Sequence, residues 1–469
     1  MQVNKSYFFC GIGGSGMLPL ALILRGHGAT VAGSDRALDQ GRTAAKFEFL
    51  KGRGIELYPQ DGSGVTSPEQ IVVVSTAVEE TVPDVIAARK IGAPLITRAE
   101  LLAQLFNAAP VSIGVAGTSG KSTVTGMIGW MLTDLGLDPT IMNGAVMKNF
   151  VSADAAFASA RVGASDIFVS EVDESDGSIA RYTPHTAVVN NISLDHKSMD
   201  ELRALFGDFV SKSKVVVLNL DNAETAALTP HAAKAITYSL SNSAANLRAE
   251  NLCPAPDGIT FDVIASQTSE TLRITLQVPG THNIYNALAA LSVAQALAIP
   301  LKDACESLSR FTGIRRRLEV VGTANDVTVI DDFAHNPDKI AATLETLHAF
   351  PGRLLILFQP HGFGPLRKMK ADFIDVFARE LAPEDVLVMP EPVYYGGTTE
   401  RSITSEDVVA GVRDAGRQAF AFPSRQECGN ELFHLAESGD RIVVMGARDD
   451  TLSTFAAELL WRLAQQPAA

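Results

Sequence analysis

The sequence contains few of the residues that mark a secreted, membrane-bound or nucleic-acid-binding protein. Its 469 residues include four cysteines, and no two have the spacing of metal ligands. The formal net charge is −14, which argues against nucleic acid or an anionic membrane surface as a partner. No apolar run is long enough to span a bilayer. We therefore expect a cytoplasmic protein with reduced thiols that binds neither nucleic acid nor a membrane.

The composition is that of a globular protein, with 46% hydrophobic and 20% charged residues and no repeats or low-complexity tracts. Short apolar strands alternate with helical segments, which predicts an α/β fold. Because the chain is too long for one core, we expect three domains, at residues 1–108, 109–322 and 323–469. The first and third are expected to be Rossmann-like. The second is expected to combine a P-loop with a small antiparallel sheet at residues 240–278.

The most informative stretch is the run from Gly117 to Thr123, which reads Gly-Thr-Ser-Gly-Lys-Ser-Thr. A predicted strand over residues 111–116 precedes it, and a helical pattern over 124–135 follows. Strand, glycine-rich turn, Lys-Ser and helix together indicate a P-loop, whose backbone N–H groups cradle the phosphates of a nucleoside triphosphate. The strict pattern needs glycine at position 115, where this chain has Val115. A surface turn with an exposed lysine is the alternative, and the matching flanks disfavour it.

A second phosphate-binding pattern lies near the start of the chain. A predicted strand at residues 7–10 leads into Gly11-Ile12-Gly13-Gly14-Ser15-Gly16, and a helix is expected over 17–24. The next strand ends at Asp35. Glycine turn, helix and acid together favour a pyrophosphate on the helix N-terminus and a sugar hydroxyl near the acid. A nicotinamide dehydrogenase is the obvious alternative, but hydride transfer has no use for a second phosphate loop.

Acidic residues from Glu171 to Asp176 follow a strand predicted at residues 166–170. A carboxylate at the carboxyl end of a strand beside a P-loop is where a Mg²⁺ ligand is needed. A solvated acidic turn is the alternative. His196 follows the strand predicted at 186–190, a place compatible both with a structural histidine and with a second metal site.

The last third of the chain again alternates strands and helices. Its predicted strands are at residues 327–330, 354–358, 385–389 and 442–445. The run from Asp331 to Pro337 follows the first of them, where open α/β sheets bind ligands. Arg315, Arg316 and Arg317 place three cations at the junction of the second and third domains, with a solvated basic run as the alternative.

As a set, these motifs resemble the Mur ligases, ATP-dependent enzymes that add amino acids to UDP-N-acetylmuramic acid during peptidoglycan assembly. The resemblance covers essentially the whole chain. It is strongest to two members that act on UDP-N-acetylmuramate itself, one adding L-alanine and the other a recycled tripeptide. It implies amide-bond formation through an acyl phosphate, with ATP as co-substrate and Mg²⁺ as cofactor. It also implies a role in cell-wall biogenesis, with UDP-N-acetylmuramate and an amino acid or short peptide as partners.

The resemblance implies roles for individual residues. Those expected to bind the UDP-sugar are Gly13, Gly14, Ser15, Gly16, Met17, Asp35, Ser75, Thr76 and Ala77. Those expected to bind ATP are Gly117, Thr118, Ser119, Gly120, Lys121, Ser122, Thr123, Asn283, Arg317 and Asp332. The expected metal ligands are Ser122, Glu171 and His196, the catalytic residues Lys121, His196 and Arg317, and the acceptor-binding residues His335 and His361.

Several positions depart from the family pattern. Ser119 stands where this subgroup usually has histidine, and Gly362-Phe363-Gly364 replaces the Arg-Tyr-Thr expected after His361. Segments 144–150 and 332–335 look closer to the tripeptide-joining member. No lysine stands where some relatives carry a carbamylated one. We expect L-alanine as the amine and keep the tripeptide ligase as the alternative.

Two interpretations lie further away. A folylpolyglutamate-type ligase uses no nucleotide sugar, and the first glycine loop disfavours it because that loop supplies a separate pyrophosphate site. A P-loop regulatory ATPase would hydrolyse ATP without an amine. Substrate-dependent release of ADP distinguishes a ligase from such a switch.

Overall fold

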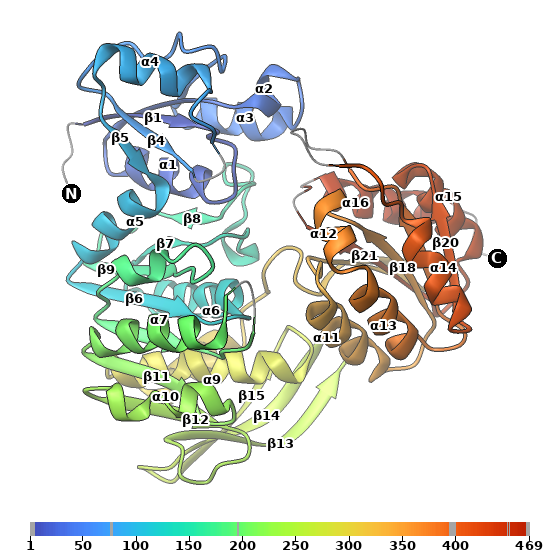
Figure 1. The fold of residues 1–469 in the computed structure, drawn as a ribbon. Coiled ribbons are helices and arrows are strands. Elements are labelled where there is room, and N and C mark those ends of the chain that lie inside the picture. Colours follow the sequence, from blue (N-terminus) through green and yellow to red (C-terminus); the bar gives the residue numbers. More distant parts are fainter. Residues whose placement is uncertain are drawn as a thin grey trace. The chain divides into compact units, whose positions relative to one another are not determined.

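The computed structural model of the chain describes residues 5–75, 78–194, 197–393, 400–447, 449 and 451–465. The chain divides into two compact units, drawn together in Figure 1. The first contains Met1–Pro254 and Gly258–Ile314, and the second contains Arg315–Ala469 with Ala255–Asp257.

The first unit begins with a five-stranded parallel sheet in the order β3-β2-β1-β4-β5. The strands are β1 (Ser6–Cys10), β2 (Thr30–Ser34), β3 (Glu56–Tyr58), β4 (Ile71–Val74) and β5 (Leu95–Thr97). The helices are α1 (Met17–Gly26), α2 (Arg36–Asp39), α3 (Ala44–Gly52), α4 (Pro83–Ile91) and α5 (Arg98–Asn107). The strand order reverses between β1 and β4, and open α/β sheets bind ligands at such a switch point. The predicted Rossmann-like domain is confirmed.

The same unit contains a ten-stranded sheet in the order β15-β14-β13-β12-β11-β10-β6-β9-β7-β8. The strands are β6 (Val111–Ala116), β7 (Thr140–Met142), β8 (Ala160–Arg161), β9 (Ile167–Glu171), β10 (Thr186–Val189), β11 (Val215–Asn219), β12 (Ala235–Ser239), β13 (Leu247–Ala255), β14 (Gly258–Ala265) and β15 (Glu270–Leu276). Strands β14 and β15 form the antiparallel pair expected from the sequence. They do not stand apart, because β13 joins them to the parallel strands and the whole forms one sheet.

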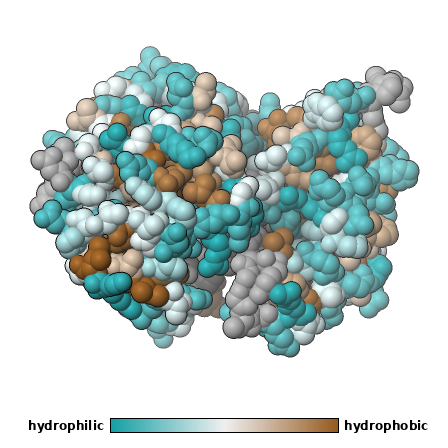
Figure 2. Space-filling model, turned by 90° about the horizontal axis from the view of Figure 1, so that it is seen from above, coloured by the Kyte–Doolittle hydropathy of each residue, from teal (hydrophilic) through white to brown (hydrophobic). Residues whose placement is uncertain are grey.

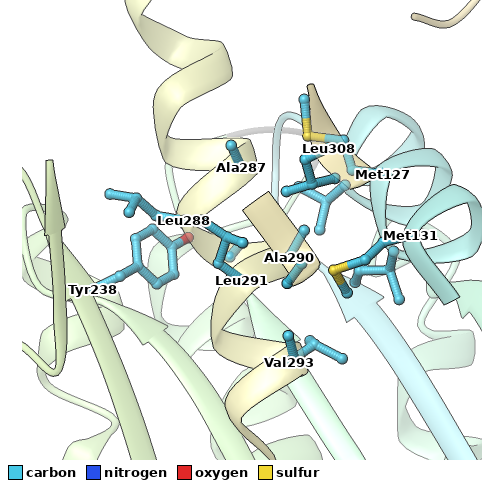
Figure 3. Close-up of a cluster of buried hydrophobic side chains, with 14 of the residues drawn as sticks. Met127, Met131, Tyr238, Ala287, Leu288, Ala290, Leu291, Val293 and Leu308 are labelled. Atoms are coloured by element: carbon cyan, nitrogen blue, oxygen red, sulfur yellow. The ribbon is translucent and has the colours of Figure 1, made fainter. Parts of the chain in front are cut away.

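Two hydrophobic cores lie on this central sheet. Helices α6 (Lys121–Asp134), α9 (Thr281–Ala296) and α10 (Leu301–Leu308) contribute to one core, and α5 and α7 (Met199–Ser211) to the other. Figure 3 shows Leu288 and Leu291 of α9 directed toward Tyr238 of β12, while Ala290 lies toward Met131 of α6. The small alanine permits close packing of the two helices. Since α6 opens with the P-loop, this core fixes the orientation of the loop's helix.

Helix α8 and three short 3₁₀ helices complete the first unit. They are α8 (Ala223–Ala226), η1 (Lys148–Phe150), η2 (Ser178–Arg181) and η3 (Thr229–His231).

The second unit is a six-stranded sheet in the order β16-β17-β21-β18-β19-β20. The strands are β16 (Glu319–Ala324), β17 (Val327–Asp332), β18 (Leu354–Gln359), β19 (Val386–Pro390), β20 (Gln418–Phe422) and β21 (Arg441–Gly446). The helices are α11 (Pro337–His348), α12 (Phe363–Lys368), α13 (Lys370–Glu380), α14 (Glu406–Asp414), α15 (Arg425–Leu435) and α16 (Thr451–Gln465). The unit begins at Arg315 rather than at the expected residue 323, because β16 pairs with β17 and belongs to this sheet.

Figure 2 shows hydrophilic side chains over most of one face, with hydrophobic residues in small groups. No helix within the described segments combines the length and the apolar character needed to cross a membrane. All four cysteines are free thiols, with Cys253 exposed and Cys10, Cys305 and Cys428 buried.

Candidate active site

The P-loop has the backbone that its glycines predict. Gly117 and Gly120 have φ angles of 134° and 86°, which side-chain-bearing residues rarely adopt. A Cβ at Gly120 would also lie 2.5 Å from Nδ2 of Asn190 and 2.6 Å from Oδ1 of Asn286. Gly120 is the N-cap of α6, so the helix begins at Lys121 rather than at the expected residue 124. The loop therefore brings a helix N-terminus and a lysine together, which suits an anion.

Hydrogen bonds from the segment after β10 stabilise this conformation of the P-loop. The N–H of Thr118 donates to the carbonyl of Asn191 at 3.0 Å. The Asn191 side chain accepts from the N–H of Ser119 at 2.9 Å and donates to its carbonyl at 3.0 Å. The N–H of Ser193 donates to Oγ1 of Thr118 at 3.0 Å. Ser119 thus uses its backbone to bind Asn191.

A chain of buried amides lies behind the loop. Tyr238 donates to Asn190 at 2.6 Å, and Asn190 donates to Asn286 at 3.0 Å. Asn286 donates to Asn283 at 2.9 Å, and Asn283 donates to the carbonyl of Pro279 at 2.6 Å. Asn283 is 6% exposed and its amide is engaged in this chain, so its contact with ATP stays a prediction. Sequence reasoning missed Asn190 and Asn286. The available signal was an amide, Asn286, beside the alanine- and leucine-rich stretch of α9, since buried polar groups need partners.

Lys121 is held by two oxygens. Its Nζ lies 2.8 Å from the carbonyl of Gly117 and 2.9 Å from Oε2 of Glu174. Burial alone would lower the pKa of Lys121, but the carboxylates of Glu174, Asp173 and Glu171 outweigh it, so the pKa lies above its ordinary value. The ammonium is therefore charged, as phosphate neutralisation requires.

Ser122 and Glu171 meet as the motif predicts. Oγ of Ser122 donates to Oε2 of Glu171 at 2.9 Å, and β9 ends at Glu171. A Cβ at Gly144 would overlap Oε1 of Glu171, so this glycine makes room for the carboxylate. The side-chain amide of Asn143 donates to the carbonyl of Ser122 at 2.8 Å and so holds the backbone of Ser122 in place. Sequence reasoning assigned no role to Gly144 or Asn143.

This pair fits Mg²⁺ by the chemistry of its donors. Mg²⁺ prefers hard oxygen ligands in an octahedron at about 2.1 Å, which puts neighbouring ligand oxygens about 3 Å apart. The two oxygens of Ser122 and Glu171 are separated by 2.9 Å. In the described part of the chain, no group of three or more His, Cys, Asp or Glu side chains is arranged to hold a metal. The third expected ligand, His196, lies outside the described residues.

The first glycine loop follows β1 at the switch point of its sheet. The N–H of Gly13 donates to Oδ2 of Asp35 at 2.8 Å, and the N–H of Ala37 donates to Oδ1 at 2.8 Å. A Cβ at Gly13 would lie 3.0 Å from that same Oδ2. Asp35 therefore ties the loop to the start of α2, and its contact with a sugar hydroxyl stays a prediction.

Gly16 is the N-cap of α1 and has no side-chain cap, and Met17 is buried at the start of that helix. Ser75 follows β4, the neighbour of β1, while Thr76 and Ala77 lie outside the described residues. Lys46 of α3, which sequence reasoning missed, donates to the carbonyl of Gly13 at 3.1 Å.

In the second unit, Arg316 and Arg317 have different surroundings. Arg316 is buried against Asp331 at 3.2 Å and donates to the carbonyl of Gly446 at 2.7 Å. Arg317 places its guanidinium carbon 4.5 Å from the centre of the Phe333 ring, a cation–π contact. Arg316 and Leu318 have φ angles of 59° and 47°, unusual for residues with side chains. The turn that presents Arg317 is thus strained on both sides.

Asp332 holds that turn. Its Oδ1 accepts from the N–H of Leu318 at 2.9 Å, and its Oδ2 accepts from the hydroxyl of Thr343 at 2.7 Å. The residue is 6% exposed. These bonds give Asp332 a structural role, and its contact with ribose stays a prediction.

The two histidines expected to bind the acceptor lie together. Their ring centres are 5.2 Å apart, and the His335 ring also lies edge-on to Phe333 at 5.3 Å. Burial lowers the pKa of His335 to about 3, with the nearby positive charge of Lys339 adding to the effect. His335 is therefore neutral at physiological pH. Next to His361, Gly362 has a φ of 126°, which explains a glycine there.

A cavity of about 340 Å³ opens at the carboxyl ends of β18, β19 and β20. Gln359, Glu391, Arg425 and Asp449 are among the residues that line it. Arg425 pairs with Asp449 at 3.1 Å, and burial raises the pKa of Glu391. Sequence reasoning missed this cavity, because its residues come from four separate segments with no shared motif.

Three family models match the chain in order. The "Mur ligase family, catalytic domain" model matches residues 6–109, the "Mur ligase middle domain" model 115–294, and the "Mur ligase, glutamate ligase domain" model 316–448. The UDP-N-acetylmuramate–L-alanine ligase of Streptomyces griseus subsp. griseus is 33% identical over 461 residues, covering 94% of each protein.

Solved structures show the same fold. The UDP-N-acetylmuramate-alanine ligase of Thermotoga maritima superposes with a TM-score of 0.79 at 23% identity, covering 98% of this chain and 99% of that one. A murein peptide ligase from Psychrobacter arcticus superposes with a TM-score of 0.71 at 24% identity, covering 99% of this chain and all of that one (100%). With its P-loop, its Ser122–Glu171 pair and these matches along its length, the chain belongs to the Mur ligase family of ATP-dependent ligases.

Proposed function

We propose that the chain joins the carboxylate of UDP-N-acetylmuramate to the amine of L-alanine at the expense of ATP, as a step of peptidoglycan synthesis. The observation that carries this proposal is the presence of two separate phosphate loops in one unit. One has the lysine and the metal-type oxygens that phosphoryl transfer requires, and the other lies at the switch point of a Rossmann-like sheet. The names of relatives such as the one in Streptomyces griseus supply the substrates.

In the proposed reaction the substrate carboxylate attacks the γ-phosphate of ATP, ADP leaves, and an acyl phosphate forms. The P-loop backbone and the charged Lys121 hold and neutralise the phosphates during the transfer. Ser122 and Glu171 are the residues that would hold Mg²⁺, with His196 as the proposed second metal ligand. When bound, Mg²⁺ supplies positive charge to the phosphate oxygens.

The amine of L-alanine then attacks the acyl carbon, phosphate leaves with the bridging oxygen, and the amine loses a proton. The second unit supplies the residues proposed for this half of the reaction. Arg317 is proposed to contact phosphate and Asp332 the ribose, while His335 and His361 are proposed to lie near the acceptor. A neutral His335 can accept a hydrogen bond or a proton, which a charged imidazolium cannot.

The acceptor is proposed to lie at the carboxyl ends of the strands of the second unit. The cavity there carries both Arg425 and Glu391, so a zwitterionic amino acid finds a partner for each of its charges. Because ATP and a nucleotide sugar are the proposed substrates, we place the protein in the cytoplasm.

The test is an ADP-release assay in which UDP-N-acetylmuramate and the amine are omitted in turn. We expect ADP to form at a substantial rate when ATP, Mg²⁺, UDP-N-acetylmuramate and L-alanine are all present. Sustained ADP release with neither UDP-N-acetylmuramate nor an amine present would instead indicate a regulatory ATPase.

The second candidate is the joining of a recycled tripeptide. Gly362-Phe363-Gly364 favours it, because the loop after β18 lacks the expected arginine and has a backbone that glycine alone adopts readily. A direct competition between L-alanine and the tripeptide L-alanyl-γ-D-glutamyl-diamino acid decides between them. Turnover with the tripeptide alone would replace L-alanine as the proposed acceptor.

A further inference from the structure

The first glycine loop contains no cation, although its proposed ligand carries a diphosphate. The run from Gly11 to Gly16 consists of glycine, isoleucine and serine. In the second loop, by contrast, Lys121 is part of the motif itself. A diphosphate bound only by backbone N–H groups would lack the charge-assisted hydrogen bonds that usually hold phosphate.

Arg98 brings a cation to this loop from the start of α5. A Cβ placed on Gly16 would lie 2.9 Å from Cδ of Arg98 and 3.2 Å from both Nε and Nη1. The guanidinium group therefore packs directly against the backbone of Gly16, the N-cap of α1. A helix N-terminus and an arginine fork are two features that each favour phosphate, and here they lie side by side.

The guanidinium has donors to offer. Within the part of the chain that the structure describes, its polar partner is Oδ2 of Asp176, at 3.6 Å. That separation is an ion pair but is too long for a hydrogen bond. The side chain is 24% exposed, so a ligand can reach it. Five N–H groups in a rigid fork suit the oxygens of a diphosphate.

The helix that carries Arg98 is fixed on both sides. Thr97 and Glu100 form a capping box at its first turn, and Phe106 packs edge-on against Tyr182 at 5.2 Å. At the other end of α5, the Asn107 side chain donates to the carbonyl of Arg181 at 2.8 Å. Leu101 of α5 and Leu18 of α1 belong to one hydrophobic core, which sets the position of Arg98 relative to Gly16.

A cation at the first position of a helix is electrostatically disfavoured, because the helix N-terminus is itself positive. Arg98 occupies that position in α5 and faces the N-terminus of α1 as well. The positive N-termini of α1 and α5 and the guanidinium of Arg98 therefore repel one another, and a bound anion would offset this repulsion. Asp176, with its 3.6 Å ion pair, and the Asp173 carboxylate, whose pKa Arg98 helps to lower, compensate part of it.

We propose that Arg98 binds the diphosphate of the UDP-sugar at the N-terminus of α1. The proposal rests on the proposed function, because it takes the ligand of the first loop to be a nucleoside diphosphate. The loop itself lacks a cation, and Arg98 supplies positive charge at its Gly16 end, while Lys46 of α3 lies at Gly13. Gly16 is required because any larger residue would displace the guanidinium.

The test is the dissociation constant of UDP and of UDP-N-acetylmuramate, measured by calorimetry for Arg98→Ala, Arg98→Lys and the unaltered protein. In Arg98→Ala, the loss of charge-assisted hydrogen bonds to phosphate is expected to raise the dissociation constants of both ligands about 10- to 100-fold. Arg98→Lys should recover part of the affinity, because it keeps the charge and loses the fork. The affinity of ATP should stay within about twofold, which also shows that the variants are folded.

Two further variants separate ligand binding from a structural role. Asp176→Asn removes the partner of Arg98, and we expect it not to weaken UDP binding. If Arg98 served only to pair with Asp176, Arg98→Ala and Asp176→Asn would lower the affinity for UDP equally. That result would overturn the proposal. Arg89→Ala is the matched control, since Arg89 belongs to the same sheet domain and pairs with Glu80 at 3.0 Å on the surface. It should leave UDP binding unchanged.

The salt dependence provides a readout that packing alone would not alter. Affinity for UDP should fall less steeply with ionic strength in Arg98→Ala than in the unaltered protein, because one phosphate–cation contact is gone. An Arg98→Ala variant that binds UDP within about twofold of the unaltered protein would overturn the role of Arg98. If the unaltered protein itself bound neither UDP nor UDP-N-acetylmuramate, the proposed function would fail instead.

Discussion

The two glycine-rich loops of the first unit share a design but obtain their positive charge differently. Each follows a parallel strand and opens a helix, α1 in one case and α6 in the other. The P-loop carries Lys121 within its own motif. The first loop has cations only from other elements, Lys46 of α3 and Arg98 of α5, among the residues that the structure describes. A local motif can therefore reveal the cation of one phosphate loop and not the cations beside the other.

The largest effect is expected at the lysine of the P-loop. Lys121→Ala should reduce turnover about 1000-fold or more, because the charge that neutralises the transferred phosphoryl group is lost. The measurement is the steady-state rate of ADP release with all substrates present. Lys51→Ala is the control, since Lys51 pairs with an exposed Glu48 at 2.8 Å. This substitution should leave the turnover unchanged. Retention of more than a small fraction of the turnover would contradict the assignment of the P-loop.

The next effect concerns the carboxylate that faces Ser122. Glu171→Gln should raise the Mg²⁺ concentration needed for half-maximal rate by about tenfold or more, because a neutral amide is a weaker ligand. Asp173→Asn and Glu174→Gln should shift this concentration much less. Glu174 binds Lys121 rather than Ser122, so its loss should act mainly on turnover. Equal shifts for all three variants would point to a general effect of charge and not to a ligand.

A third prediction tests the first loop through its backbone. Gly14→Val should weaken the binding of UDP-N-acetylmuramate about tenfold or more. A Cβ at position 14 would already lie 3.3 Å from the carbonyl oxygen of Gly11, and the larger valine side chain would crowd the turn. ATP affinity should be unchanged. Gly52→Val is the control, because no atom lies within 4 Å of a Cβ there. Equal loss of both ligands would mean that the substitution had unfolded the domain.

Much of the fold could be predicted because its strands are short apolar runs with sharp ends. The predicted limits of β4 and β6, Ile71–Val74 and Val111–Ala116, agree with the structure. Strand β20 was missed, since Gln418–Phe422 is an edge strand with exposed positions and its apolar run is only four residues long. The start of the second unit was placed too late because β16 contains polar and small residues and reads as a linker.

The site was predictable where chemistry is local in sequence. Lys121 and Ser122 are neighbours, and a strand end brings Glu171 to them. Asn190, Asn286 and Arg98 were not found, because each acts through a contact with a distant segment. Such contacts depend on which helices and strands pack together, and a single sequence does not specify that pairing.

The smallest effect concerns the protonation of His335. Its pKa in the folded protein is about 3, against about 6.5 for an exposed histidine, so the ring should remain neutral between pH 8 and pH 5. Because the folded pKa lies below the unfolded one, this group lowers the stability as the pH falls below about 6.5. The measurement is the NMR titration of the labelled imidazoles, with His335→Gln to assign the resonance. A midpoint near 6.5 would show that the ring is open to solvent.

The most direct test of the account follows oxygen from the substrate carboxylate. UDP-N-acetylmuramate labelled with ¹⁸O in its carboxylate is incubated with ATP, Mg²⁺ and L-alanine, and the released phosphate is analysed by mass spectrometry. Attack of the carboxylate on ATP makes one of its oxygens the bridge of the acyl phosphate, so the account predicts one ¹⁸O in each phosphate released with amide product. Phosphate that carries oxygen from water alone would show plain hydrolysis of ATP and would contradict the proposed ligase.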